Sequence, residues 1–320
     1  MRSYSLLAPA KINLHLEILG DRADGYHELV MVLQSLDLAD RIELSPNRTD
    51  AIRVSGNAER LPPERDNLAY QAAQLMAQQF PQAYAQHGGV TITIDKRIPI
   101  AAGMAGGSSD AAAVLVGLDL MWQLGLTQPE LQNLAAQLGS DLPFCVAGGT
   151  ALATGRGEQL EALAGPHRLA VVIAKHRNLS VSTAWAYCRY RERFGNEYCR
   201  NPQDARARAQ RVHSGALVSA IAQQDGAQIG QRLHNDFERI VLDEFPQVAQ
   251  LRDAFERQAT LGSLISGSGP AVFALCESLE EAARVRQAVA DELADPELEF
   301  WTSQLSSAGI QLADPAARSR

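Results

Sequence analysis

The segment from residue 90 to residue 122 places a strand, a glycine-rich loop and a helix in direct succession. "VTITID" is rich in β-branched residues and predicts a strand, and "PIAAGMAGGSSDAA" (99–112) is a loop of small residues. "SSDAAAVLVGLDLMWQLG" predicts a helix that opens on serine and aspartate caps and closes on Gly125. Such a loop directs backbone N–H groups and the positive end of the helix dipole at one place. The segment therefore predicts an anion site, with phosphate as the candidate ligand.

The composition of this loop supports phosphate binding without proving it. Gly103, Gly106 and Gly107 permit close approach of a ligand to the backbone, and Ser108 and Ser109 can cap the helix and donate to phosphate oxygens. The loop lacks the Gly-Lys-Ser/Thr ending of the common nucleotide-binding loop, so a cation would have to come from elsewhere. Taken alone, a glycine-rich turn before a helix is just as often plain architecture.

The stretch "AKINLHLEILG" near the start of the chain alternates apolar and polar residues over nine positions. This period of two predicts a half-buried strand. Its polar face presents Lys11 and Asn13 side by side. By itself, a lysine on such a face is most often a surface residue.

Strands and helices are interspersed along the chain without a strict alternation, which favours an α+β fold in two lobes. We place the N-terminal lobe at 1–164, the C-terminal lobe at 165–312 and a frayed tail at 313–320. Further signals are a helix after an Asn67 cap, a turn at Asp24-Gly25, a strand at 169–174 and helix caps at Thr127 and Ser278. A second Gly-Ser loop, "SGSG", stands between two apolar runs near residue 267.

Charge and cysteine content exclude several classes of function. With 37 acidic and 29 basic residues the net charge is −8, which argues against a nucleic-acid partner. The arginine-rich segment 189–213 is interpreted as a solvated or mobile surface insertion. The four cysteines form no C-x-x-C pair, and no apolar run predicts a signal peptide or a membrane span. We expect a cytoplasmic protein with no membrane partner.

Four stretches together carry a resemblance to a known family. "PAKINL", the loop 99–112, "GSDLPF" and "SGSGPAVFA", in that order, resemble the signature motifs of the GHMP kinase superfamily. "PAKINLHLEILGDRADGYHEL", "IDKRIPIAAGMAGGSSDAA" and "LGSDLPF" narrow the resemblance, which spans residues 4–311, to the branch that phosphorylates cytidylated methylerythritol. It implies a two-lobed fold with the active site in the cleft between the lobes. It also implies transfer of the γ-phosphoryl group of ATP to the 2-hydroxyl of the methylerythritol unit.

The resemblance implies roles for particular residues. Asp141 would accept the proton of the hydroxyl, and Lys11 would keep that carboxylate ionised. From the residues alone, a helix N-cap is the favoured interpretation of Asp141. The implied nucleotide-binding residues are Pro99, Ile100, Ala101, Ala102, Gly103, Met104, Ala105, Gly106, Gly107, Ser108 and Ser109, with Asn67 and Lys96. The implied substrate-binding residues are Asn13, Tyr26, His27, Thr183 and Tyr187, with Trp185 as a competitor for the last. The second glycine loop is Gly267, Ser268 and Gly269.

Mg²⁺ is implied together with ATP, since a divalent cation screens the charge of the triphosphate. The sequence does not identify the residues that would bind the cation. The sequence departs from the family at Ala101, Ala102 and Ala105, where the loop usually has more glycines, and at Asp110, where relatives often have asparagine. The alternatives are another kinase of this fold, of mevalonate or homoserine type, and an inactive member that only binds a ligand. We expect a monomer or a weak homodimer.

Overall fold

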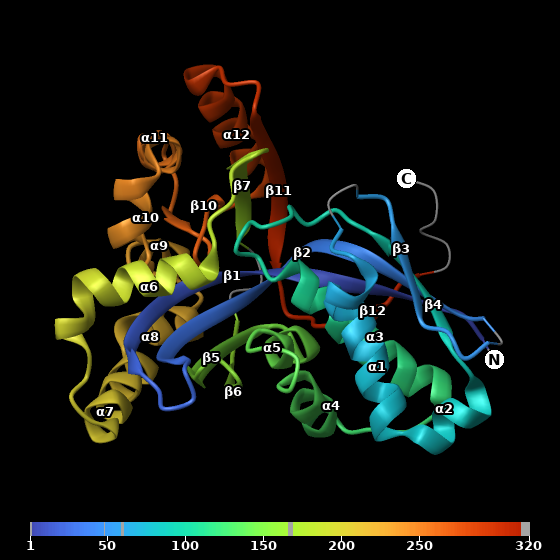
Figure 1. The fold of residues 1–320 in the computed structure, drawn as a ribbon. Coiled ribbons are helices and arrows are strands. Elements are labelled where there is room, and N and C mark those ends of the chain that lie inside the picture. The colour runs from blue at the N-terminus through green and yellow to red at the C-terminus, as the bar shows by residue number, and fades with distance from the viewer. Residues whose placement is uncertain (1, 48, 59–60, 166–168, 315–320) are drawn as a thin grey trace.

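The computed structural model describes residues 2–47, 49–58, 61–165 and 169–314. Two long antiparallel strands, β1 (Tyr4–Asp21) and β2 (His27–Pro46), cross the middle of the molecule (Figure 1). The turn between them holds Gly25 at a φ of 84°, a conformation that favours glycine. Register shifts in the pairing fall between Pro9 and Lys11 and between Asn13 and His15. These irregularities lie beside the residues that the sequence singles out on this strand.

Around these two strands a sheet is built from both halves of the chain. Its main path runs β12-β1-β2-β11-β7-β10-β9, while β4 and β5 also pair with β2, and β8 pairs with β1. The remaining strands of the first half are β3 (Arg53–Gly56), β4 (Val90–Asp95), β5 (Thr150–Gly155) and β6 (Gln159–Leu163). Those of the second half are β7 (Ala170–His176), β8 (His234–Asn235), β9 (Gly262–Ile265), β10 (Val272–Cys276), β11 (Leu298–Ser306) and β12 (Gln311–Leu312).

Helices of the first half gather at one end of the molecule, where α3 packs against α1, α5 and β1 (Figure 1). Apolar side chains of α1, α3, β2 and β4 form one buried cluster there. These helices are α1 (Leu68–Gln79), α2 (Pro81–His87), α3 (Gly106–Trp122), α4 (Gln128–Ala135) and α5 (Leu142–Ala147). A 3₁₀ turn, Glu64–Asp66, precedes α1.

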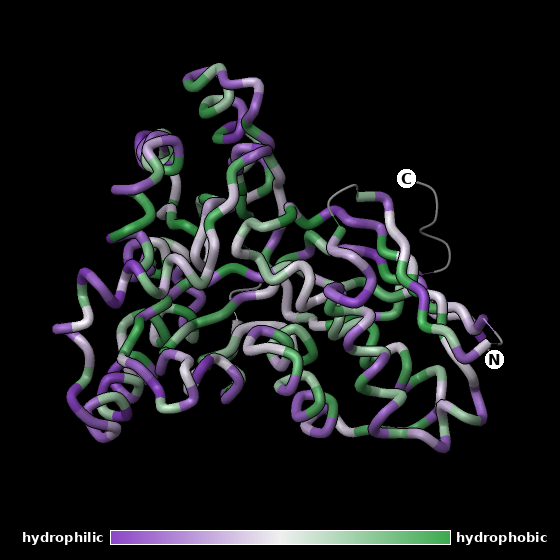
Figure 2. Tube along the Cα trace, viewed as in Figure 1, coloured by the Kyte–Doolittle hydropathy of each residue, from purple (hydrophilic) through white to green (hydrophobic). Residues whose placement is uncertain are grey.

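Helices of the second half pack on different parts of the sheet: α11 and α12 contact β7 and β10, α9 contacts β9, and α7 contacts β1 and β2. They are α6 (Thr183–Phe194), α7 (Pro202–His213), α8 (Ala216–Gln223), α9 (Gly226–Gly230), α10 (Glu238–Glu244), α11 (Pro246–Glu256) and α12 (Leu279–Leu293), with a 3₁₀ turn at Gly195–Glu197. Coloured by the hydropathy of each residue, outer helices such as α7 and α12 contain many hydrophilic residues (Figure 2). No helix in the described part of the chain is long and apolar enough to cross a membrane.

Most local predictions are confirmed. Asn67 caps α1, Thr127 forms a full capping box with Glu130, and Ser278 caps α12. The start of α3 is a correction: the helix begins at Gly106 with Ala105 in the capping position and no side-chain cap, so the serines lie inside its first turn. The arginine-rich segment is not irregular, because it forms the end of α6 and all of α7 on the surface.

The predicted division at 164/165 stays a prediction, because it adjoins residues 166–168, which lie outside the described residues. Pairing of Leu36 in β2 with Leu305 in β11 joins strands from the two sides of that boundary into one sheet. Of the tail, residues 315–320 also lie outside the described part.

Candidate active site

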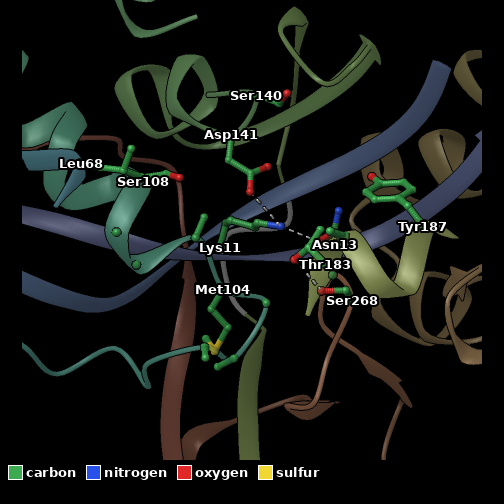
Figure 3. Close-up of a pocket in the computed structure, with 18 of the residues that line it drawn as sticks. Lys11, Asn13, Leu68, Met104, Ser108, Ser140, Asp141, Thr183, Tyr187 and Ser268 are labelled. Carbon is green, nitrogen blue, oxygen red and sulfur yellow. Dashed lines mark hydrogen bonds and ion pairs between the residues drawn. The ribbon is translucent and has the colours of Figure 1, made fainter. Parts of the chain in front are cut away.

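A cavity of about 930 Å³ collects side chains from both halves of the chain. It is bounded by β1, the turn before β2, the glycine-rich loop, the start of α5, the start of α6 and the second glycine loop. Figure 3 shows side chains from these elements converging on one space. Of the predicted residues, it is lined by Lys11, Asn13, Tyr26, His27, Asn67, Lys96, Pro99 to Ser108 without a break, Asp141, Thr183, Tyr187, Gly267 and Ser268.

Lys11 lies deep in this cavity, with only 4% of its surface exposed. Its Nζ donates to Asn13 Oδ1 at 2.8 Å and is 3.9 Å from Asp141 Oδ2 (Figure 3). The backbone N–H of Lys11 also donates to the Met104 carbonyl at 3.2 Å, which ties the strand to the glycine-rich loop. The structure therefore brings Lys11 and Asp141 together, although they are 130 residues apart in the sequence. The glycine-rich loop lies beside both.

Asp141 occupies the N-cap position of α5, yet its side chain makes no capping hydrogen bond. The interpretation of Asp141 as a mere helix cap is therefore wrong for this side chain. Its carboxylate is 35% exposed and points into the cavity toward Lys11 (Figure 3). A carboxylate held beside a buried ammonium but open to a ligand is suited to accept a proton from a bound hydroxyl.

The glycine-rich loop packs directly against the second glycine loop. Ser266 Oγ donates to the Gly103 carbonyl at 3.0 Å, and a Cβ added at Gly103 would lie 2.0 Å from the Ser266 carbonyl oxygen. Only glycine fits there. Ala101 and Ala105 adopt φ values of 53° and 54°, so these departures from the family pattern still take the left-handed conformation that glycine would supply.

Ser109 is a correction to the predicted nucleotide-binding set. It is completely buried, and its hydroxyl donates to the Pro9 carbonyl at 2.7 Å. Because α3 begins three residues earlier, this side chain faces β1 and joins the helix to the strand. Ser108 lines the cavity, whereas Ser109 and Gly269 do not.

Lys96 lines the cavity but is bound by two carboxylates. Its Nζ lies 2.5 Å from Asp40 Oδ2 and 2.8 Å from Asp110 Oδ2, and both aspartates are buried. Burial raises the pKa of Asp110 to about 8. The charge of Lys96 opposes this increase in pKa, and the charge of Asp40 adds to it. Asp110 Oδ1 has no hydrogen-bond partner among the described residues. Burial and Asp40 thus oppose a negative charge on Asp110 beside the phosphate site, whereas Lys96 favours it.

Aromatic side chains from the turn before β2 and from α6 form another part of the cavity wall. Tyr26 is 49% exposed, as a residue that stacks on a ligand requires. His27 is buried and stacks on Tyr187 with ring centroids 4.3 Å apart, which leaves no room for a base between these two rings. Burial lowers the pKa of His27, with Asp21 opposing the decrease and Arg191 adding to it. Trp185 packs on Phe245 and does not line the cavity, which favours Tyr187 over Trp185.

Several residues that shape the site were not predicted. Asn235 Nδ2 donates to the carbonyls of Ile265 and Gly267 and so holds the second glycine loop. The contact between two predicted residues was not foreseen either: Thr183 Oγ1 and Ser268 Oγ are 3.0 Å apart, which joins α6 to the same loop. Asp40, Arg156 and Asn235 stand in stretches with no recognisable motif, and only their contacts in the folded chain identify them.

Family models match the chain in two blocks, the GHMP kinases N terminal domain at residues 67–149 and the GHMP kinases C terminal domain at 217–295. The chain belongs to the GHMP kinase family. A homoserine kinase structure from Cytophaga hutchinsonii shares its fold, with a TM-score of 0.75 and 19% identity over 98% of both chains. The predicted α+β fold of this family is confirmed.

The curated relatives narrow this family further. The chain is 55% identical to proteins named 4-diphosphocytidyl-2-C-methyl-D-erythritol kinase from Gloeothece citriformis (98% of this chain, 99% of the relative) and from Trichodesmium erythraeum (98% and 100%). A crystal structure of 4-(cytidine 5'-diphospho)-2C-methyl-D-erythritol kinase superposes with a TM-score of 0.72 and 33% identity, covering 95% of this chain and 100% of that one. Within the GHMP kinases, the chain falls among these enzymes.

Proposed function

We propose that this chain transfers the γ-phosphoryl group of ATP to the 2-hydroxyl of 4-diphosphocytidyl-2-C-methyl-D-erythritol, releasing the 2-phosphate and ADP. This is a step of the non-mevalonate route to isoprenoid precursors, and the names of the curated relatives support it. The single observation that carries the mechanism is the Lys11–Asp141 pair, which lies in one cavity with the glycine-rich loop and Tyr26.

In this mechanism the phosphates of ATP bind against the loop 99–108. There the backbone N–H groups and the N-terminus of α3 stabilise the negative charge of the phosphates. Tyr26, His27 and Tyr187 receive the cytosine end, and Asn13 and Thr183 contact the sugar alcohol. Asp141 accepts the proton of the 2-hydroxyl as that oxygen attacks the γ-phosphorus, a contribution of roughly 10²–10⁴-fold. Lys11, whose ammonium lies 3.9 Å from Asp141 Oδ2, orients this carboxylate through their ion pair.

Mg²⁺ belongs to the proposal because it neutralises charge that develops on the transferred group. In the described part of the chain no group of three or more His, Cys, Asp or Glu side chains could hold a metal ion. Mg²⁺ usually keeps several waters and binds through substrate phosphates with one or two carboxylates. The cavity fits that mode, since the loop 99–108 would hold the phosphates that carry the ion, and Asp66 lines the same cavity as a further carboxylate.

Asn67 caps α1 through its side chain, which accepts from the Ala69 N–H at 2.9 Å, and it also lines the cavity. Its contact with nucleotide stays a prediction, as do the cytoplasmic location and the state as a monomer or weak homodimer. Sedimentation of the purified protein tests the last of these.

A substrate panel tests the proposed function directly. ADP formation is measured with 4-diphosphocytidyl-2-C-methyl-D-erythritol, mevalonate and homoserine side by side, and the phosphorylated carbon is identified by phosphorus NMR. We expect turnover of the cytidylated alcohol alone, with the new phosphate on the 2-oxygen. Equal turnover of mevalonate or homoserine would favour another GHMP kinase activity, and no turnover with stoichiometric ATP binding would favour an inactive ligand-binding protein.

A further inference from the structure

Four cationic side chains line the cavity, and they differ in how their charge is compensated. Lys11, Lys96 and Arg191 each have a carboxylate within ion-pair distance, from Asp141, from Asp40 with Asp110, and from Asp21 respectively. Arg156 has none among the residues that the structure describes. Its guanidinium NH2 donates to the Ala136 carbonyl at 2.6 Å, a neutral partner, while the nearby Glu158 carboxylate accepts from the backbone N–H of Arg156 rather than from the guanidinium.

The position of Arg156 follows from the turn that carries it. The residue lies between β5 and β6, directly after Gly155, which pairs with Leu29 beside the Tyr26–His27 turn. Its guanidinium carbon lies 4.8 Å from the centroid of the Tyr26 ring. Gly157, the residue after Arg156, lies close to Ser140, the neighbour of Asp141: a Cβ added at Gly157 would be 3.7 Å from Ser140. Arg156 therefore lines the cavity beside Tyr26, and Ser140 and Asp141 line the same cavity.

We propose that Arg156 binds the diphosphate of the cytidylated substrate, an inference that rests on the proposed function. In that substrate the diphosphate joins the cytidine to the sugar alcohol. A substrate with its base against Tyr26 and its hydroxyl against Asp141 must lay the diphosphate across the space between them. Arginine matches phosphate oxygens through a rigid fork of N–H groups. Its stacking on Tyr26 orients the guanidinium before the ligand arrives.

The triphosphate of ATP is the other phosphate-containing anion to consider as the ligand of Arg156. The loop 99–108 already offers backbone N–H groups and a helix N-terminus for that triphosphate. Arg156 instead contacts the residue assigned to the base, so we assign it to the diphosphate of the cytidylated substrate. The experiment has to separate these two anions.

The test compares Arg156→Gln with the wild type by calorimetric titration of CDP, cytidine and a non-hydrolysable ATP analogue. Loss of charge-assisted hydrogen bonds predicts a CDP affinity weaker by roughly 10- to 100-fold. Cytidine has no phosphate, so its affinity should change by less than about fivefold, the effect of losing one exposed cation–π contact. ATP-analogue affinity should stay within about twofold.

Two further variants keep the inference open to refutation. Arg156→Lys retains the charge without the fork and should recover part of the CDP affinity, while Arg257→Gln removes a surface arginine paired with Glu292 and should change nothing. Equal losses for CDP and cytidine would overturn the inference in favour of Tyr26 positioning alone. A weaker ATP analogue with unchanged CDP would assign Arg156 to the nucleotide. Thermal unfolding of each variant shows whether it is folded.

Failure of this inference is distinguishable from failure of the proposed function. If the wild type does not turn over the cytidylated alcohol, the function itself is wrong. If the wild type does so and Arg156→Gln binds CDP as tightly, only the role of Arg156 is wrong. Added salt sharpens the distinction, because it should weaken CDP binding more in the wild type than in Arg156→Gln.

Discussion

Lys11 and Lys96 are both buried lysines on the wall of one cavity, but their electrostatic surroundings differ. Lys11 faces a single carboxylate, Asp141, at 3.9 Å, and that carboxylate is 35% exposed. Lys96 contacts two carboxylates, Asp40 and Asp110, at 2.5 Å and 2.8 Å, and both are buried. The first lysine keeps a charge that can act on a ligand, whereas the charge of the second is satisfied within the protein.

The difference indicates that Lys11 and Lys96 have different roles beside the glycine-rich loop. Asp40 also accepts the N–H groups of Arg97 and Ile98 at 2.6 Å and 2.9 Å, so the Lys96 cluster fixes the chain where the loop begins. Breaking a buried ion pair leaves a charge without a partner, which is costly for folding. We infer that the Lys96 cluster supports the loop and that the Lys11 pair carries out the reaction.

The largest effect on turnover is expected for Asp141→Asn. Asparagine retains the shape but cannot accept the substrate proton, so kcat should fall by roughly 10²–10⁴-fold. The affinities for ATP and for the cytidylated substrate should stay within about threefold, measured by calorimetry. A kcat above a tenth of the wild-type value would remove Asp141 from the role of base.

The largest effect on stability is expected for Asp40→Asn. Removing one partner of this buried cluster should lower the free energy of unfolding by about 3–5 kcal/mol, measured by urea denaturation. The matched control is Asp95→Asn, which breaks an exposed pair with Arg97 and should cost about 0–1 kcal/mol. Equal losses in the two variants would contradict the supporting role of the Lys96 cluster.

A pH-dependent effect on stability is expected for Asp110→Asn. Burial raises the pKa of Asp110 from 3.8 to about 8, so the folded state holds a proton that the unfolded chain releases between these pH values. The contribution of Asp110 to stability is therefore full below pH 4 and declines as the pH rises to about 8. Asparagine has no proton to lose.

The stability of Asp110→Asn relative to the wild type should accordingly increase from pH 5 to pH 8, by at most about 1.4 kcal/mol per pH unit, and level off above pH 9. Urea denaturation at pH 5, 6.5, 8 and 9 measures this difference. A difference that does not vary with pH would show that Asp110 does not titrate in this range.

Local elements and motif positions were predictable from the sequence because they depend on short-range patterns. The strand into the loop and the caps at Asn67, Thr127 and Ser278 rest on such patterns, whereas the roles suggested for Lys11 and Asp141 come from the resemblance of their motifs to the GHMP kinases and stay proposals. Contacts such as Lys96 with Asp40, 56 residues apart, have no local pattern. For the same reason the burial of Ser109 against Pro9 and the contact of Arg156 with Tyr26 required the folded chain.

The central claim, that Lys11 and Asp141 act as one catalytic unit, is tested most directly by a double-mutant cycle. Single-turnover rates of phosphoryl transfer are measured for the wild type, Lys11→Met, Asp141→Asn and the double variant, at saturating ATP and cytidylated substrate. Residues that act as a unit lose activity non-additively, so the double variant should be within about threefold of the slower single variant. Losses that multiply fully would show that Lys11 serves the phosphates independently of Asp141 and would contradict the account.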